Sequence, residues 1–166
     1  MRKWVIAMGV ATMASGAAAQ APASQWRYFE PAGQPIQAGV VNAQGAQLLI
    51  KCDKPGKKSV YVALANPERL VPPARDPFLL PTEMRFDDRA PIDSRWRFMD
   101  NSAMAMNARG VLTLDQVMAN LPGASKLRLR MYVERGREIE VSFDVAGAQE
   151  AIDRVYASCQ DDKPAS

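Results

Sequence analysis

The stretch that decides the fold, Lys126–Cys159, reads KLRLRMYVERGREIEVSFDVAGAQEAIDRVYASC. Apolar and polar residues alternate with a period of two over 126–134 and again over 137–145. This alternation predicts two β-strands, each with one buried face. Gly136 stands at the third position of the intervening loop, where a type I turn is followed by a left-handed residue. From Ala146 the period becomes helical, so we expect a hairpin followed by a helix that ends on a cysteine.

The polar faces of the two predicted strands carry charges of opposite sign. If a three-residue loop closes the hairpin, Arg130 faces Glu140 and Lys126 faces Asp144. Each such cross-strand pair on a solvated face contributes at most about 1 kcal/mol. We therefore expect a surface on which the charged side chains pair with one another. The alternative is a stripe that recognises an anionic ligand, formed by Arg95, Arg97, Arg128 and Arg130.

The N-terminus has the three regions of a secretory signal peptide. A basic start, Met1–Lys3, precedes an apolar core, Trp4–Met13, and the small residues Ala17–Ala19 form a cleavage site. We therefore expect 1–19 to be removed and 20–25 to be a flexible lead-in. A retained N-terminal anchor is the alternative, but the apolar run is too short for an ordinary membrane span.

Removal of this peptide changes the charge of the chain. The 166 residues carry a formal charge of +3, with 21 basic and 18 acidic side chains. Without Arg2 and Lys3, 19 basic side chains remain against 18 acidic ones. This near-neutral balance argues against a nucleic-acid partner. No later stretch is apolar for long enough to span a membrane, so no span is expected after cleavage.

The two cysteines are predicted to form a disulfide. Cys52 is in phase with Leu48 and Ile50 on the inner face of a predicted strand, and Cys159 is in phase with Val155 on the inner side of the last helix. Both thiols therefore point into one interior, in a chain exported to a compartment that permits disulfides. Two separate buried thiols are the alternative.

The rest of the chain predicts one domain, 26–160, of the α+β class. We expect an antiparallel β-sheet or small β-sandwich of about six or seven strands, with the C-terminal helix packed on it and one short helix. That short helix covers 111–121, with Thr113 as its cap. Strand candidates are 26–29, 36–41, 47–52, 58–64, 83–86 and 95–99. Irregular segments are expected at 66–81, which contains five prolines, at 101–110, and in the disordered tail 161–166.

The residue types present argue against catalysis. The chain has no histidine, which excludes Ser-His-Asp and Cys-His systems and histidine-ligated zinc. No glycine-rich phosphate-binding motif occurs, so we expect no cofactor and no metal site. The densest acidic group is Asp87-Asp88 with Asp93 nearby, in a segment rich in turn formers. A local turn role for these aspartates is favoured over a glycosidase or metal role. The protein is expected not to be an enzyme.

Several short motifs follow one another in a known order. They are Trp26, Leu48–Cys52, Val60–Leu64, Met84–Asp87, Trp96, Phe143, Gly147, Ala151-Ile152 and Cys159. This series resembles small exported proteobacterial proteins of the VasI/TagO type, accessories of type VI secretion. The resemblance implies an accessory role in the cell envelope without a catalytic site. The proline-rich segment Asn66–Pro81 departs from the pattern of those proteins.

We expect the chain to be a periplasmic or secreted interaction module, an accessory of an envelope or secretion assembly with a protein partner in the cell envelope. The apolar triplet Phe78, Leu79 and Leu80 in the proline-rich segment is the predicted contact surface, because prolines reduce the freedom that a loop loses on binding. The alternative for Phe78 is a place in the core. The alternative function is a proteinaceous inhibitor of a wall-degrading enzyme such as lysozyme, with 66–81 or 87–94 as its inserting loop.

Overall fold

The computed structural model describes residues 25–108, 110–133 and 136–163. The predicted signal peptide, almost all of the lead-in and the last three residues of the tail lie outside these ranges. No helix within them is both long enough and apolar enough to cross a membrane.

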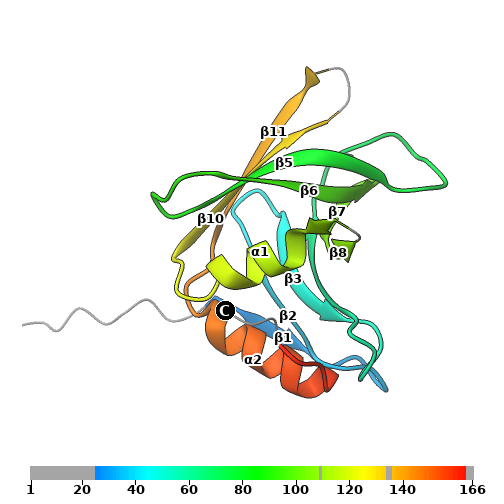
Figure 1. The fold of residues 1–166 in the computed structure, drawn as a ribbon, viewed down its shortest axis with the longest axis vertical. Coiled ribbons are helices and arrows are strands. Elements are labelled where there is room, and N and C mark those ends of the chain that lie inside the picture. The colour runs from blue at the N-terminus through cyan, green and yellow to red at the C-terminus, as the bar shows by residue number, and fades with distance from the viewer. Residues whose placement is uncertain (1–24, 109, 134–135, 164–166) are drawn as a thin grey trace, which may run out of the picture.

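The structure confirms the α+β class, and the described residues form one large antiparallel sheet and two helices (Figure 1). The sheet has nine strands in the order β1-β2-β3-β4-β7-β6-β5-β10-β11, and β8 and β9 form a separate small ribbon. The strands are β1 Arg27–Phe29, β2 Gln37–Val41, β3 Gln47–Cys52, β4 Val60–Ala65, β5 Phe78–Phe86, β6 Ile92–Met99, β7 Ser102–Ala105, β8 Asn107–Ala108, β9 Val111–Leu112, β10 Lys126–Tyr132 and β11 Glu138–Asp144. The helices are α1 Thr113–Asn120 and α2 Ala148–Cys159.

The sheet curls into a half-barrel rather than splitting into a sandwich (Figure 1). Its two ends approach each other, since the side-chain amide of Asn42, which follows β2, donates to the carbonyl of Ser142 in β11 at 3.2 Å. The indole of Trp26 donates to the carbonyl of Val145, just beyond β11, at 3.3 Å. These contacts join the N-terminal strands to the last strand and give the sheet an inner and an outer face.

The inner face and both helices enclose one hydrophobic core. Alternate residues of the strands point inward, which explains why the period-two pattern in the sequence locates them. α1 contacts β4, β6 and β7, while α2 contacts β2, β3 and β4. The largest fully buried side chains include Trp96, Phe86 and Phe98.

The β10–β11 hairpin has the predicted register. Arg130 pairs with Glu140 and Lys126 pairs with Asp144. The amide of Val133 donates to the carbonyl of Arg137 at 2.9 Å, and Gly136 has φ 72°, the left-handed conformation that the loop position requires.

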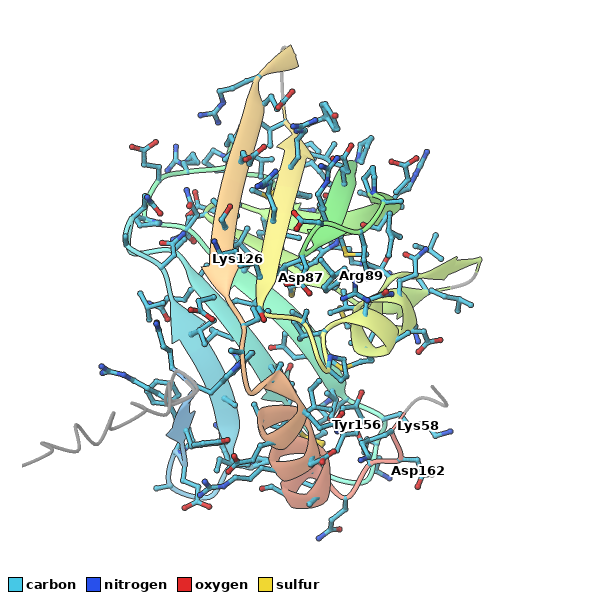
Figure 2. The ribbon with its side chains drawn as sticks, turned by 90° about the vertical axis from the view of Figure 1, so that its left-hand side faces the viewer. Lys58, Asp87, Arg89, Lys126, Tyr156 and Asp162 are labelled. Atoms are coloured by element: carbon cyan, nitrogen blue, oxygen red, sulfur yellow. A yellow bond between two sulfur atoms is a disulfide. The ribbon has the colours of Figure 1, made fainter. Side chains whose placement is uncertain are left out.

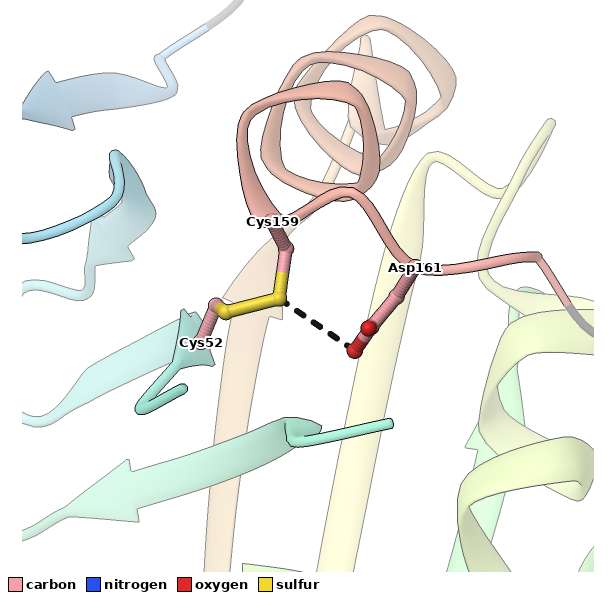
Figure 3. A group of neighbouring side chains, drawn as sticks. All are labelled: Cys52, Cys159 and Asp161. Atoms are coloured by element: carbon pink, nitrogen blue, oxygen red, sulfur yellow. Dashed lines mark hydrogen bonds between the residues drawn. A yellow bond between two sulfur atoms is a disulfide. The ribbon is translucent and has the colours of Figure 1, made fainter. Parts of the chain in front are cut away.

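The disulfide between Cys52 and Cys159 is confirmed (Figure 3). The two Cα atoms are 5.9 Å apart, and both residues are buried. The bond ties the end of β3 to the end of α2 across a sequence separation of 107 residues. A disulfide of this kind persists in an oxidising compartment, which places the folded chain outside the reducing cytosol.

Two segments expected to be irregular are strands. β5 begins at Phe78, inside the proline-rich segment, and β7 lies inside the predicted loop 101–110. β7 pairs with both β4 and β6, so it is an internal strand of the sheet. Its sequence, SAMA, has none of the β-branched or aromatic residues typical of strands, and neighbouring strands rather than local preference keep it extended.

Thr113 does not cap α1 as predicted. It is the first residue of the helix, and its hydroxyl donates to the carbonyl of Arg95 in β6 at 2.8 Å. The side-chain oxygen of Asn107 instead accepts from the amide of Asp115, the third helical residue, at 3.2 Å. The capping group therefore comes from β8, which sequence spacing around the helix start does not show.

Candidate functional site

The predicted contact residues Phe78, Leu79 and Leu80 lie at the start of β5, and the alternation of the strand separates them. Phe78 and Leu80 are half-buried and pack against the core. Leu79 points outward and is 46% exposed. The triplet is therefore not one uniform apolar surface, and only Leu79 is fully available to a partner.

Exposed apolar residues from two other elements lie near this end of β5. Leu112, the last residue of β9, is 58% exposed, and Tyr132, the last residue of β10, is 42% exposed. Both line a hollow of about 440 Å³ together with Pro81, which is two residues from Leu79. We call Leu79, Pro81, Leu112 and Tyr132 the β5 patch.

The outer face beside the β5 patch carries two exposed arginines. Arg95 pairs with Pro81 across β5 and β6, and Arg97 pairs with Leu79 on one side and Met104 of β7 on the other. Neither arginine takes part in the ion pairs found among the described residues. Arg97 therefore presents its charge between two apolar side chains.

The outer face of the β10–β11 hairpin has the opposite character. Arg130 lies 3.0 Å from a carboxylate oxygen of Glu138, 3.3 Å from one of Glu140 and 3.8 Å from one of Glu83. Arg128 is 3.5 Å from the other carboxylate oxygen of Glu140. The expected pairing of Arg130 with Glu140 is therefore confirmed, whereas Lys126 and Asp144 face each other without an ion pair among the described residues.

The side chain of Asp87 forms hydrogen bonds with backbone amides. Asp87 has φ 52°, and one of its carboxylate oxygens accepts from the amides of Ser125 and Lys126 at 2.9 and 2.8 Å. Arg89, close by in Figure 2, donates to the carbonyl of Asn120 at 3.0 Å, at the end of α1. These bonds fix the turn after β5 against the segment that leads into β10.

One group of potential metal ligands lies at the disulfide (Figure 3). The Sγ atoms of Cys52 and Cys159 and a carboxylate oxygen of Asp161 lie within 4.8 Å of one another. The sulfur atoms are bonded to each other, so neither is a thiolate. The two Asp161 oxygens accept from the amides of Lys58 and Ser59 at 3.0 and 2.8 Å. These bonds join the segment after α2 to the β3–β4 hairpin. The sulfur atoms and the carboxylate of Asp161 are thus already engaged within the protein.

A second hollow, of about 590 Å³, lies on the opposite side of α1 from the hollow at the β5 patch. It is bounded by the C-terminal end of α2, the start of β4 and the segment joining β7 to β8. Tyr156 of α2 lines it, and burial raises the pKa of its hydroxyl to about 12, with smaller contributions from the charges of Asp115 and Asp161. Sequence reasoning assigned no role to Tyr156, because the inner stripe predicted for the last helix was Ala148, Ala151, Ile152, Val155 and Cys159. The available signal was its spacing of four residues from Ile152, which brings it close to that stripe.

Comparison with known proteins gives a fold relationship. The chain is similar to the crystal structure of invasion associated protein B from Bartonella henselae, with a TM-score of 0.52 and 14% sequence identity. The match covers 81% of this chain and 93% of that chain. No protein family matches the sequence, and no curated protein matches it. At this identity the similarity concerns the fold.

Proposed function

We propose that this chain is an exported, non-enzymatic interaction module that binds a protein partner in the cell envelope through the β5 patch. The observation that carries the proposal is the gathering of exposed apolar side chains from β5, β9 and β10 around one hollow. Interface energy is concentrated in aromatic, arginine and aliphatic anchors that fill such hollows. Tyr132, Leu112 and Arg97 are residues of these types in one neighbourhood.

The chemistry of the patch defines the partner. Apolar surface at Leu79 and Leu112 favours an aliphatic or aromatic anchor on the partner. Arg97 favours a carboxylate beside that anchor, because a charge without an internal partner gains most from an external one. Arg95 instead shares the hollow with Glu83 and Asp93. The proposed partner is therefore a protein surface with an apolar side chain flanked by an acidic residue.

The setting of this function is the periplasm or the exterior of the cell. The disulfide is consistent with export, and the structure with the similar fold is named an invasion associated protein. The VasI/TagO resemblance supports a place as an accessory of an envelope or secretion assembly. These arguments support the same compartment independently of the β5 patch.

The test is capture of partners from envelope extract with the mature protein, comparing Leu112→Asp with Val41→Asp. Val41 is 52% exposed at the end of β2, so it is a matched apolar control away from the β5 patch. We expect Leu112→Asp to lose the captured protein and Val41→Asp to retain it, with at least about tenfold weaker affinity for Leu112→Asp when the purified partner is titrated. Equal capture by both variants would contradict the proposal.

The inhibitor alternative is tested in the same experiment. It needs a protruding loop, and the two segments that could supply one are shorter than the sequence indicated, because 78–81 and 92–94 lie in strands. Capture of a wall-degrading enzyme, together with inhibition of its activity by the pure protein, would favour the inhibitor over the assembly accessory.

A further inference from the structure

The hollow at the end of α2 contains a polar group with no internal partner. Tyr156 is only 4% exposed, and its hydroxyl is buried without a hydrogen-bond partner. Its pKa is raised to about 12, so the hydroxyl stays protonated at ordinary pH and can donate. Buried hydroxyls are normally hydrogen-bonded, because leaving one unpaired costs folding free energy.

The charges of Asp115 and Asp161 both act on this hydroxyl. Asp115 is on α1 and Asp161 follows α2, and both residues line the hollow. Tyr156 lines the same hollow, so it shares this space with both carboxylates. Figure 2 shows Tyr156 with Lys58 and Asp162 at this end of α2.

Most charged groups around the hollow are already engaged. Asp161 accepts from two backbone amides, Lys163 forms an ion pair with Asp153 at 2.6 Å, and one oxygen of Asp115 accepts from Asn107 at 2.7 Å. Among the described residues, the ion pairs include neither Lys58 nor Asp162, although both line the hollow. One ammonium group, one carboxylate and one buried hydroxyl donor are therefore left for a ligand.

We propose that this hollow binds a small zwitterion of amino-acid or dipeptide size. Its carboxylate would accept from the Tyr156 hydroxyl and pair with the Lys58 ammonium group. Its ammonium group would pair with Asp162 and with the remaining oxygen of Asp115. Val60, Leu114 and Met106 supply apolar walls, and a volume of about 590 Å³ is in the range of small-molecule sites.

This assignment has chemical selectivity. A simple anion would meet the negative charges of Asp115, Asp161 and Asp162 around the hollow without an ammonium group to offset them. A simple cation would leave the buried Tyr156 hydroxyl without an acceptor. A ligand that carries both charges is therefore favoured over one that carries either alone. The site lies apart from the β5 patch, so a test of zwitterion binding does not depend on whether the proposed partner exists.

The test titrates the disulfide-bonded protein with alanyl-alanine, N-acetyl-alanyl-alanine and alanyl-alaninamide, which are a zwitterion, an anion and a cation of similar shape. Binding is followed by calorimetry and by the NMR signal of the Tyr156 ring. We expect saturable binding of alanyl-alanine and at least tenfold weaker binding of the two singly charged probes. Absence of saturable binding, or equal binding of a singly charged probe, would overturn the proposal.

Tyr156→Phe is the decisive variant, with Tyr132→Phe as the matched control on the β5 patch. Removal of an unpartnered hydroxyl should leave thermal stability unchanged or raise it, while affinity for alanyl-alanine falls about tenfold. Tyr132→Phe should keep full affinity. If Tyr156→Phe binds alanyl-alanine as the wild type does, the hydroxyl is not part of a ligand site. Lys58→Ala, at an exposed loop position, provides a second variant and should also lower the affinity for alanyl-alanine.

Discussion

The outer face of β10–β11 and the outer face at the start of β5 belong to one sheet, yet they differ in how their charges are matched. Arg130 lies near three glutamates, whereas Arg97 lies between Leu79 and Met104. The inner sides of the same strands are alike, since both contribute to the core. Burial in the core therefore determines the residue types of the inner faces. On the outer faces, an arginine without an acidic neighbour marks the place where a partner could add an ion pair.

The largest expected effect on stability is that of removing the disulfide, which supports the sheet on which both surfaces lie. In the chain-entropy model, a disulfide closing a loop of this length contributes roughly 4–5 kcal/mol. Replacing Cys52 and Cys159 with alanine should lower the free energy of unfolding by up to that amount, as measured by urea denaturation. A double variant as stable as the wild type would show that the link does not hold the two parts of the fold together. Non-reducing mass spectrometry with alkylation checks that the wild type has no free thiol.

A smaller effect is expected at Phe78, which lies beside the β5 patch but is half-buried against the core. Complete truncation of a buried phenylalanine costs about 3–5 kcal/mol, so Phe78→Ala should cost about 2 kcal/mol. Denaturation measures the stability, and binding to the captured partner should fall less than for Leu112→Asp. A loss of binding without any loss of stability would instead show that Phe78 belongs to the contact surface.

The smallest effect is expected on the hairpin. Arg130→Ala removes a partly exposed arginine from three acidic neighbours, so the midpoint of urea denaturation should fall only slightly. This fall should shrink in high salt, because salt screens exposed ion pairs. A large fall that persists in high salt would show that the hairpin face has a structural role beyond charge matching.

The sequence predicts those parts of the fold in which a local pattern and the tertiary structure agree. The alternation in Lys126–Asp144 shows which residues point inward, and the phases of Cys52 and Cys159 locate the disulfide. β7 could not be found in this way, because its residues are small and its neighbours in the sheet, β4 and β6, hold it in place.

The start of β5 was missed because Pro81 was taken to exclude a strand. Pro81 faces Arg95 in β6, and because proline has no backbone N–H the two residues cannot form a hydrogen-bonded pair. The nitrogen of Pro81 therefore faces the edge where pairing with β10 has ended, at Thr82 and Met131. Proline is tolerated in a strand at such an unpaired position.

The β5 patch could be predicted only in part. Leu79 was identified from its apolar segment, and Tyr132 occupies an outward position in the alternation of β10, which is a signal that the sequence does contain. Leu112 precedes α1 and gave no such signal. The patch forms because the chain brings β9 next to β5 and β10, and that proximity depends on the tertiary fold.

The central claim is that the partner binds at the start of β5 and not at the charge-paired arginines of the hairpin. The most direct measurement is the affinity of the captured partner for Arg97→Ala and Arg128→Ala, with the stability of both variants determined in parallel. Arg128 is a suitable control because it pairs with Glu140 and does not line the hollow at the β5 patch. Arg97→Ala should lose about tenfold or more in affinity at unchanged stability, and Arg128→Ala should lose a little stability at unchanged affinity. The reverse result, with affinity lost in Arg128→Ala and kept in Arg97→Ala, would contradict the account.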